Sequence, residues 1–411
     1  MFQTPALSEL EKNQHGLQDT TRSGFPRSKR RRALTGLTLT YFLTFGSMGI
    51  QLPFTALAMK HAGLGPAVIG SMWAARSLTG AFSPLVYGLI ADRLGGARLL
   101  LLIALACGVA VFTGLAVFPG PVSAVVLFAL FGCFANPANS LVDGMILTVL
   151  GPQASRYGRF RAAGTVGFGL SAVAVSTLIE RGMLSPAPAS LFPICAALIA
   201  GAFVVVLVVV PPVPRPVLTS FAGVSVALKD PLLIGLVLAG SLLWASHAGY
   251  VSFLSPLAEA VGLPGTVGMA IAAAVVVEAI AMPMSPLLLR RVSSGTVLVA
   301  CAVVGTLRWV LTPWCDTPWS FALVNGLHGI SFGLFFVVIV GVIAQKVPAT
   351  LRQTSQGLLS SLSLGLGGMV GGLGVGAMLE QHADVRAIWW SMAAIAALSA
   401  VVLVPVARRL R

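Results

Sequence analysis

The sequence predicts an all-α membrane protein with twelve transmembrane helices in two six-helix repeats, and three observations support this fold class. First, the 411 residues are 57% hydrophobic and only 9% charged, whereas about 25% of the residues of a soluble domain are charged. Second, apolar runs of about 20 residues, the length that crosses a bilayer core, recur along the chain. Third, basic loops fall at matching positions in its two halves. In lipid each apolar run must be helical, because a helix satisfies its own backbone hydrogen bonds.

Twelve apolar segments are long enough to be predicted as spans. The first six cover 34–59, 66–90, 98–118, 122–150, 160–179 and 190–211. The second six cover 231–258, 264–289, 296–314, 317–345, 355–379 and 386–407. The shortest separations are FPGPV (118–122) and WCDT (314–317). Both are expected to be tight turns.

The longest polar-leaning interruption is 211–230, which carries four prolines and divides six spans from six. We therefore predict an N-terminal six-helix bundle over 33–211, a central cytoplasmic linker over 212–230 and a C-terminal six-helix bundle over 231–411. Residues 1–32 are polar and end in RSKRRR, so they are predicted to form a disordered cytoplasmic tail. This tail is not expected to be a cleaved signal peptide, because the apolar run that follows it is too long.

The basic residues are distributed unevenly between the two predicted sides. Of the 26 Lys and Arg residues, 21 lie in the termini and in the loops of one side, whereas only Lys60, Arg181 and Arg386 lie on the other. Loops rich in Lys and Arg mark the cytoplasmic side, so we expect a multi-pass protein of a bacterial-type inner (plasma) membrane with both termini in the cytoplasm. The net charge of +14 then reflects contact with the lipid bilayer. No basic patch with interleaved aromatic residues indicates a nucleic acid.

The repeated halves are typical of transporters that rock around a substrate site near the middle of the membrane. The central linker leaves no room for a soluble catalytic domain, and the chain contains no H-E-x-x-H or P-loop motif. GISFG (329–333) matches the nucleophile pattern G-x-S-x-G but lies inside a predicted span, without the strand–turn–helix context of that motif. The five scattered cysteines suit neither a metal site nor a disulfide framework. We predict no enzyme activity, no metal and no cofactor.

Ionisable side chains inside spans are costly and are therefore candidates for function. The chain has six: Arg76, Asp143, His247, Glu278, Arg308 and His328. Counting residues places Arg76, His247, Glu278 and His328 near the centres of their spans, whereas Asp143 lies nearer the cytoplasmic end and Arg308 in the outer half.

These positions predict two sets of charge pairs. Glu278 is expected to meet Arg308 or His328, and Asp143 is expected to meet Arg76 or Arg161. A carboxylate buried alone favours its protonated form, and a cationic partner restores the ionised form. A glutamate that gains and loses such a partner would therefore take up and release a proton. Two plainer interpretations stay open: a fixed structural ion pair between Asp143 and Arg161, and a hydrogen-bonded core residue for His247.

The substrate site is expected to be mostly apolar with a few polar groups. Trp244, His247 and Tyr250 lie about one turn apart on the seventh span, and Gln51 lies on the first. Aromatic side chains near cations such as Arg76 predict a small aromatic or carboxylated solute. Simple packing is the alternative for Trp244 and Tyr250.

Six segments together carry a family resemblance. They are ADRLGGAR (91–98), PANSLVDGMIL (137–147), YGRFRAAGTVGF (157–168), VVVEAIAMPMSPLLLRR (275–291), LRW (307–309) and LHGISFG (327–333). The chain resembles the major facilitator superfamily, in the branch that contains phenylpropionate permeases, nucleoside–proton symporters and relatives of lactose permease.

The resemblance implies the major facilitator fold and roles for particular residues. It implies a latch at the cytoplasmic helix ends, made by Asp92, Arg93, Asp143, Tyr157, Gly158, Arg159 and Arg161. It also implies a proton-coupling cluster of Glu278, Arg308 and His328. Lactose permease has a carboxylate one turn after its helix-ten histidine, where this chain has Ser331, so galactoside transport is not implied. Ala163 and Thr165 depart from the aromatic and the serine of the usual YGRxRxWGS pattern.

The direction of transport follows from one further comparison with the superfamily. Relatives that export drugs usually carry a Gly-Pro motif in helix five, and TVGFGLSAVAV (165–175) has no proline. We therefore predict a monomeric secondary active transporter that carries a small organic solute, such as an aromatic or carboxylated compound or a nucleoside, together with protons by alternating access. A proton-driven exporter of the same fold and a non-transporting membrane protein are the two alternatives.

Overall fold

The computed structural model of this chain describes residues 27–410 with gaps at 95, 136, 213–228 and 348–351. The side chains of 27, 84–86, 88–94, 152, 154, 155, 344 and 352–354 are outside the description as well. All elements formed by the described residues are helical, and eleven helical segments among them are long and apolar enough to cross a membrane. This confirms the predicted fold class. Most of the predicted tail (1–26) and of the predicted linker (213–228) lies outside the described residues.

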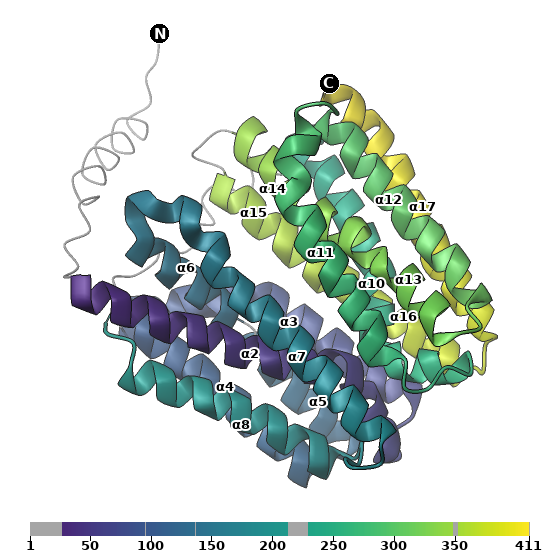
Figure 1. Ribbon diagram of the computed structural model, residues 1–411, viewed down its shortest axis with the longest axis horizontal. Helices are drawn as coiled ribbons and strands as arrows, with labels where there is room; N and C mark the ends of the chain where they lie inside the picture. Colours follow the sequence, from purple (N-terminus) through teal and green to yellow (C-terminus); the bar gives the residue numbers. More distant parts are fainter. Residues whose placement is uncertain (1–26, 95, 136, 213–228, 348–351, 411) are drawn as a thin grey trace.

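The N-terminal half contributes six helical segments, which coincide with the first six predicted spans. They are α2 (Arg27–His61); α3 (Pro66–Leu94); α4 (Ala97–Val117); α5 (Pro121–Leu130), continued by the π-helical η2 (Phe131–Ala135) and α6 (Ala138–Leu150); α7 (Tyr157–Glu180), preceded by η3 (Gly151–Arg156); and α8 (Pro188–Val208). In Figure 1 these helices lie side by side as one bundle, from purple to teal.

The C-terminal half contributes the remaining six helical segments. They are α10 (Pro231–Ala260); α11 (Val267–Leu289); α12 (Ser294–Leu311) with η5 (Thr312–Trp314); α13 (Pro318–Gly326), η6 (Gly329–Leu334) and α14 (Phe335–Lys346); α15 (Arg352–Ser360), η8 (Ser361–Gly367) and α16 (Gly368–Glu380); and α17 (Val385–Arg409). They form a second bundle beside the first (Figure 1).

The first helix begins earlier than the sequence predicted. Residues 27–32 were expected to belong to the tail, but they form the first turns of α2. Two of their arginines bind the ends of neighbouring helices: Arg32 donates to the carbonyl of Val208 at 2.5 Å, and Arg30 donates to that of Leu150 at 3.4 Å. The last carbonyls of a helix lack intrahelical partners, so these contacts stabilise the end of α8, the end of α6 and the start of α2 together.

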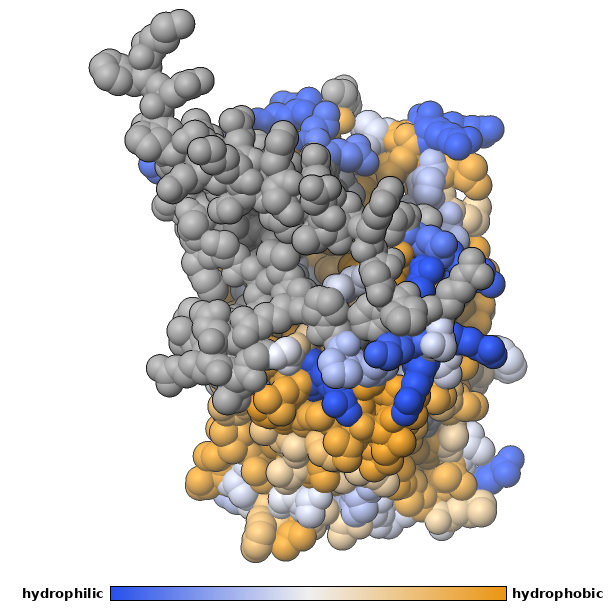
Figure 2. All heavy atoms as spheres, turned by 90° about the vertical axis from the view of Figure 1, so that its left-hand side faces the viewer, coloured by the Kyte–Doolittle hydropathy of each residue, from blue (hydrophilic) through white to orange (hydrophobic). Residues whose placement is uncertain are grey.

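Large apolar side chains cover the outside of both bundles. Val166 and Leu170 on α7 are each 59% exposed, and Leu323 on α13 is 73% exposed. An apolar surface of this kind is stable in contact with lipid tails, which need no hydrogen bonds. Figure 2, which faces the end where α2 begins, shows hydrophilic residues gathered above a broad apolar surface.

Small residues let the two bundles approach closely. On α3 and α16, a Cβ atom at Gly70 would lie 2.7 Å from the carbonyl oxygen of Gly372, and one at Gly376 would lie 2.8 Å from that of Pro66. Helices that meet through glycine pack backbone against backbone. This contact therefore holds the N-terminal and C-terminal bundles together at one end.

Candidate functional site

The fourth helix of each bundle is interrupted by a π-helical segment at a corresponding place. In the first bundle this segment is η2, with the sequence FGCFA, and in the second it is η6, with the sequence GISFGL. π-Helical turns inside α-helices occur frequently at functional sites. Helices broken at corresponding positions of two repeats mark the binding site in many transporters.

The glycines of these two segments contact the residues that the sequence singled out on the second helix of each bundle. Gly132 in η2 packs against the backbone carbonyl of Arg76, and Gly329 in η6 packs against the backbone nitrogen of Glu278. A Cβ atom at Gly333 would also lie 2.8 Å from Cγ of Glu278. Arg76 and Glu278 thus hold equivalent places in the two halves, a cation in one and a carboxylate in the other. The GISFG motif serves this packing.

Arg308 is completely buried inside the C-terminal bundle. Its guanidinium carbon lies 4.4 Å from the ring centroid of Tyr250 and 4.0 Å from that of Trp309. Its Nη2 atom donates to Oδ1 of Asn325 at 2.8 Å, and its Nη1 atom lies 3.0 Å from Nδ1 of His328. Aromatic faces attract a cation, so neutral groups hold this positive charge in place.

His247 lies next to that cluster and uses both of its ring nitrogens. Nδ1 is 2.8 Å from the carbonyl oxygen of Leu243, and Nε2 is 3.1 Å from Oγ of Ser331. The geometry fits a neutral ring that donates to Leu243 and accepts from Ser331, an assignment made from the hydrogen-bond pattern. The ring centroids of His247 and His328 are 5.3 Å apart. His247 is therefore connected to Arg308 through His328.

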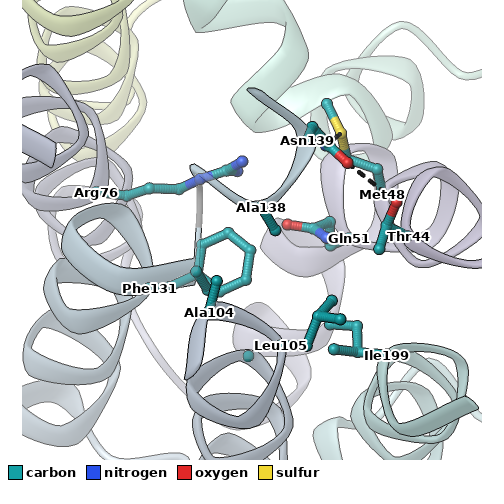
Figure 3. A pocket seen from close by; sticks show the side chains of 12 residues that line it. Thr44, Met48, Gln51, Arg76, Ala104, Leu105, Phe131, Ala138, Asn139 and Ile199 are labelled. Atoms are coloured by element: carbon teal, nitrogen blue, oxygen red, sulfur yellow. Dashed lines mark hydrogen bonds between the residues drawn. The ribbon is translucent and has the colours of Figure 1, made fainter. Parts of the chain in front are cut away.

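A small cavity of about 30 Å³ lies inside the N-terminal bundle, and its mainly apolar lining includes the polar side chains of Thr44, Gln51, Arg76 and Asn139 (Figure 3). Arg76 extends into it from α3 toward Asn139 and Gln51, and its guanidinium lies 5.0 Å from the centroids of the Trp73 and Phe131 rings. Oε1 of Gln51 is buried and accepts no hydrogen bond from the described residues. A space of this size with polar groups in its wall holds one or two water molecules.

The end of α6 and the start of α7 bring together three of the predicted latch residues. The Tyr157 hydroxyl donates a hydrogen bond to Oδ1 of Asp143 and lies 3.2 Å from the hydroxyl of Tyr41. The guanidinium of Arg161, one turn after Tyr157 on α7, lies 4.1 Å from the ring centroid of Phe45.

Arg161 lies on α7, which packs against α11, the helix of the other bundle that carries Glu278. Neither Asp143 nor Glu278 lies within the 4.0 Å of an ion pair with Arg161. The sequence predicted that Glu278 would meet Arg308 or His328, and the structure shows no ion pair of Glu278 with either residue. Instead, α11 packs against α7 of the other bundle, where a Cβ atom at Gly169 would lie 3.7 Å from Val275.

Trp244 faces the junction between the bundles. Its indole Nε1 is 3.4 Å from the position of a Cβ atom on Gly368, where Ser77 of α3 also packs. Its ring centroid is 4.9 Å from that of Phe332, which stacks on His328 at 5.1 Å. An aromatic wall therefore runs from the junction to the buried cluster around Arg308.

Two further predicted latch residues, Gly158 and Arg159, do not join this arrangement. Arg159 and Gly158 are exposed at the start of α7, and the side chains of Asp92 and Arg93, in the last turn of α3, lie outside the described residues. Among the described residues no group of three His, Cys, Asp or Glu side chains has the arrangement of a metal site.

Three contributors were missed by the sequence analysis. Asn325 is uncharged and therefore escaped a search for ionisable residues, although it is fully buried and binds Arg308. Phe45 and Trp309 looked like ordinary core residues but lie against the guanidinium groups of Arg161 and Arg308. Of these three residues only Asn325 has a recognisable signal in the sequence, because it is a polar side chain within a mainly apolar helix.

Comparisons with a family model, with a curated protein and with solved structures all lead to membrane transporters. A family model described as "MFS_1 like family" matches residues 34–390. The probable 3-phenylpropionic acid transporter of Escherichia coli (strain K12) is 26% identical over 342 residues, which cover 80% of this chain and 86% of that protein.

Two solved structures resemble the fold over nearly their full lengths. The crystal structure of the nucleoside transporter NupG has a TM-score of 0.78 at 18% identity and covers 91% of this chain and 98% of its own. The POT family transporter PepTSo has a TM-score of 0.72 at 14% identity and covers 94% and 99%.

Proposed function

The chain belongs to the MFS_1-like family, and we propose that it takes up a small carboxylated aromatic solute together with protons by alternating access. The relationship to transporters makes it a multi-pass membrane transporter of a small molecule and not an enzyme. The arginine distribution supports an inner-membrane location with both termini in the cytoplasm. No oligomeric contact is required for a site formed between two bundles of one chain, so the proposed unit is a monomer.

The position of Arg161 carries the proposal for proton coupling. Arg161 lies on α7, which contacts α6 through the Tyr157–Asp143 hydrogen bond and packs against α11, the helix of Glu278, so we infer that one guanidinium serves both carboxylates. When the bundles rock, the distance from Arg161 to Glu278 changes while the distance to Asp143 is held by the packing of α6 and α7. A carboxylate that loses its cation in a medium of low polarity takes up a proton. Rocking would thus be linked to protonation of Glu278.

The charges of the candidate site favour an anionic solute. Three arginines, Arg76, Arg161 and Arg308, are accompanied by only two carboxylates, Asp143 and Glu278, among the described residues of the site. Buried positive charge is costly without an anion. A single carboxylate on the solute would balance the site while Glu278 is ionised, and a co-transported proton on Glu278 would leave one net positive charge there.

The aromatic wall favours a ring on the same solute. Trp244 and Phe332 lie between the bundle junction and the buried cluster, and aromatic rings prefer stacked or edge-on contact with other rings. The printed name of the Escherichia coli relative, a probable 3-phenylpropionic acid transporter, agrees with a solute that combines a ring and a carboxylate.

Uptake into proteoliposomes tests the proposal. Labelled 3-phenylpropionate is added outside vesicles that contain the purified protein, with the outside medium acid relative to the inside. We expect the initial rate to exceed that of protein-free vesicles, to fall when a protonophore removes the gradient, and to be inhibited by other aryl carboxylates but not by nucleosides. The protein-free control is essential because the neutral acid crosses lipid unaided. A protein-dependent rate that is faster with the acid side inside would indicate an exporter and contradict the proposal.

A further inference from the structure

A second binding site lies at the end of the N-terminal bundle where α2 begins. A groove of about 540 Å³ opens there between the start of α2, the end of α6 and the start of α7. It is lined by Arg30, Arg31, Leu34, Thr35, Thr38, Leu39, Leu150, Gln153, Arg156 and Phe160. Three of these residues are arginines, none is acidic, and none belongs to the candidate transport site.

Two of the arginines converge on one neutral acceptor. Nη2 of Arg30 donates to Oε1 of Gln153 at 3.0 Å, and Nη1 of Arg156 donates to the same oxygen at 3.1 Å. Nε of Arg30 is buried and has no hydrogen-bond partner among the described residues. Two like charges that share one uncharged oxygen repel each other, and guanidinium groups bind phosphate oxygens well. The arrangement therefore suits an anion with several acceptor oxygens.

The rest of the groove is apolar. Leu34, Leu150 and Phe160 form part of its wall, and Leu39, one turn further into the membrane, is 45% exposed. A ligand that fills the whole groove must carry an anionic head and an apolar tail. Inorganic phosphate has the first and lacks the second.

We propose that this groove binds one anionic phospholipid, with its phosphate on Arg30 and Arg156 and an acyl chain along Leu34 and Leu39. The proposal shares with the proposed function the orientation that puts this end in the cytoplasm, where basic pockets between helices meet anionic headgroups. The chain that precedes α2 is a poorer occupant, because residues 1–26 carry three acidic side chains, Glu9, Glu11 and Asp19, against two basic ones, Lys12 and Arg22.

Lipid binding to the purified full-length protein in detergent tests the proposal without any transport measurement, so its failure is separate from a failure of the proposed function. Phosphatidylglycerol and phosphatidylcholine are titrated and counted on the protein by native mass spectrometry. We expect one phosphatidylglycerol to be retained in preference to phosphatidylcholine. The double variant R30Q/R156Q should bind it roughly tenfold more weakly, which corresponds to about 1.4 kcal/mol.

The matched control is R290Q/R291Q, which removes two exposed arginines at the same end of the other bundle. Unchanged phosphatidylglycerol binding in this control supports the groove. Equal loss in both double variants would show a general charge effect and overturn the proposal. Displacement of the lipid by millimolar inorganic phosphate would assign the site to a free anion and would overturn it as well. Melting temperatures of both variants in detergent confirm that each is folded.

Discussion

Nζ of Lys60 lies 2.7 Å from Oε2 of Glu259, and this ion pair joins the end of α2 in one bundle to the end of α10 in the other. Nearby, Oε2 of Glu380 accepts a hydrogen bond of 3.0 Å from the backbone of Ala67 at the start of α3. The positive end of a helix favours such a carboxylate. Both contacts lie at the end opposite the arginine-rich one, so they close the bundles on that side.

A third contact at this end mirrors the one made by Glu380. Oγ of Ser176 on α7 donates to Glu180 at 2.8 Å and accepts from the backbone of Gly268 on α11 at 3.0 Å. The pairs α7 with α11 and α16 with α3 are equivalent under the repeat. These carboxylates, Glu180 and Glu380, are therefore in place to favour the state in which the bundles are closed at this end, the outer one in the proposed orientation.

Removing these two carboxylate charges is expected to open the outer side. Ser255, which is 3% exposed and donates to the carbonyl of Pro53 across the junction at 2.6 Å, serves as a reporter after substitution by cysteine in a background without the native cysteines. We predict that E180Q/E380Q raises the labelling rate of this cysteine by a membrane-impermeant thiol reagent severalfold. Lys60→Ala alone should have little effect, since an exposed ion pair contributes about 0–1 kcal/mol.

The control for this experiment is Asp384→Asn. Asp384 lies at the same end, but its side chain caps its own helix by accepting from the backbone of Arg386 at 2.9 Å. An equal rise in labelling for Asp384→Asn, or none for E180Q/E380Q, would argue against a role of the two glutamates in closure.

Replacing Arg308 by lysine should impair transport severely. Lysine keeps the charge but loses the planar group that lies over Tyr250 and Trp309 and reaches Asn325 and His328. Each hydrogen bond of a charged group is worth about 1.5–3 kcal/mol, so we expect at least a tenfold lower initial uptake rate in proteoliposomes. Arg290→Lys, at an exposed position of the same bundle, should leave the rate unchanged. Wild-type uptake by Arg308→Lys would show that Arg308 has no part in transport.

Gly167 and Gly169 of α7 differ in the space around them, so replacing each by alanine tests the packing of α7 against α2. A Cβ atom at Gly167 would lie 3.1 Å from Cα of Phe42 and closer still to its carbonyl oxygen, whereas one at Gly169 would meet nothing nearer than Val275 at 3.7 Å. Overpacking of this kind costs about 1–3 kcal/mol. We predict that Gly167→Ala lowers the melting temperature in detergent by several degrees and that Gly169→Ala does not. Equal melting temperatures would contradict the described contact of α2 with α7.

The fold was predictable because each span must satisfy its own backbone in lipid. Apolar runs gave the helix positions within a few residues, and the exception, the start of α2, depends on contacts that Arg30 and Arg32 make with the ends of distant helices. A local pattern holds no information about such contacts.

The candidate residues were predictable, but not all of their partners were. Ionisable side chains are costly inside the membrane, and this criterion pointed to Arg308 and His328. Nη1 of Arg308 does lie 3.0 Å from Nδ1 of His328. The closeness of the Glu278 helix to the Arg161 helix was not anticipated, because it depends on how α7 of one bundle packs against α11 of the other. Counting residues gives a depth in the membrane and leaves the rotation of each helix undetermined.

The most direct test of the account concerns Glu278 as the proton carrier. Glutamine is neutral and resembles the protonated side chain, so Glu278→Gln should still exchange loaded solute between the two sides but should be unable to release a proton. We predict that the variant keeps counterflow of labelled 3-phenylpropionate above protein-free vesicles and loses protein-dependent accumulation driven by an acid outside medium. Asp316→Asn, at an exposed turn, should retain both. Full gradient-driven accumulation by Glu278→Gln would contradict the central claim that rocking and protonation are linked at this residue.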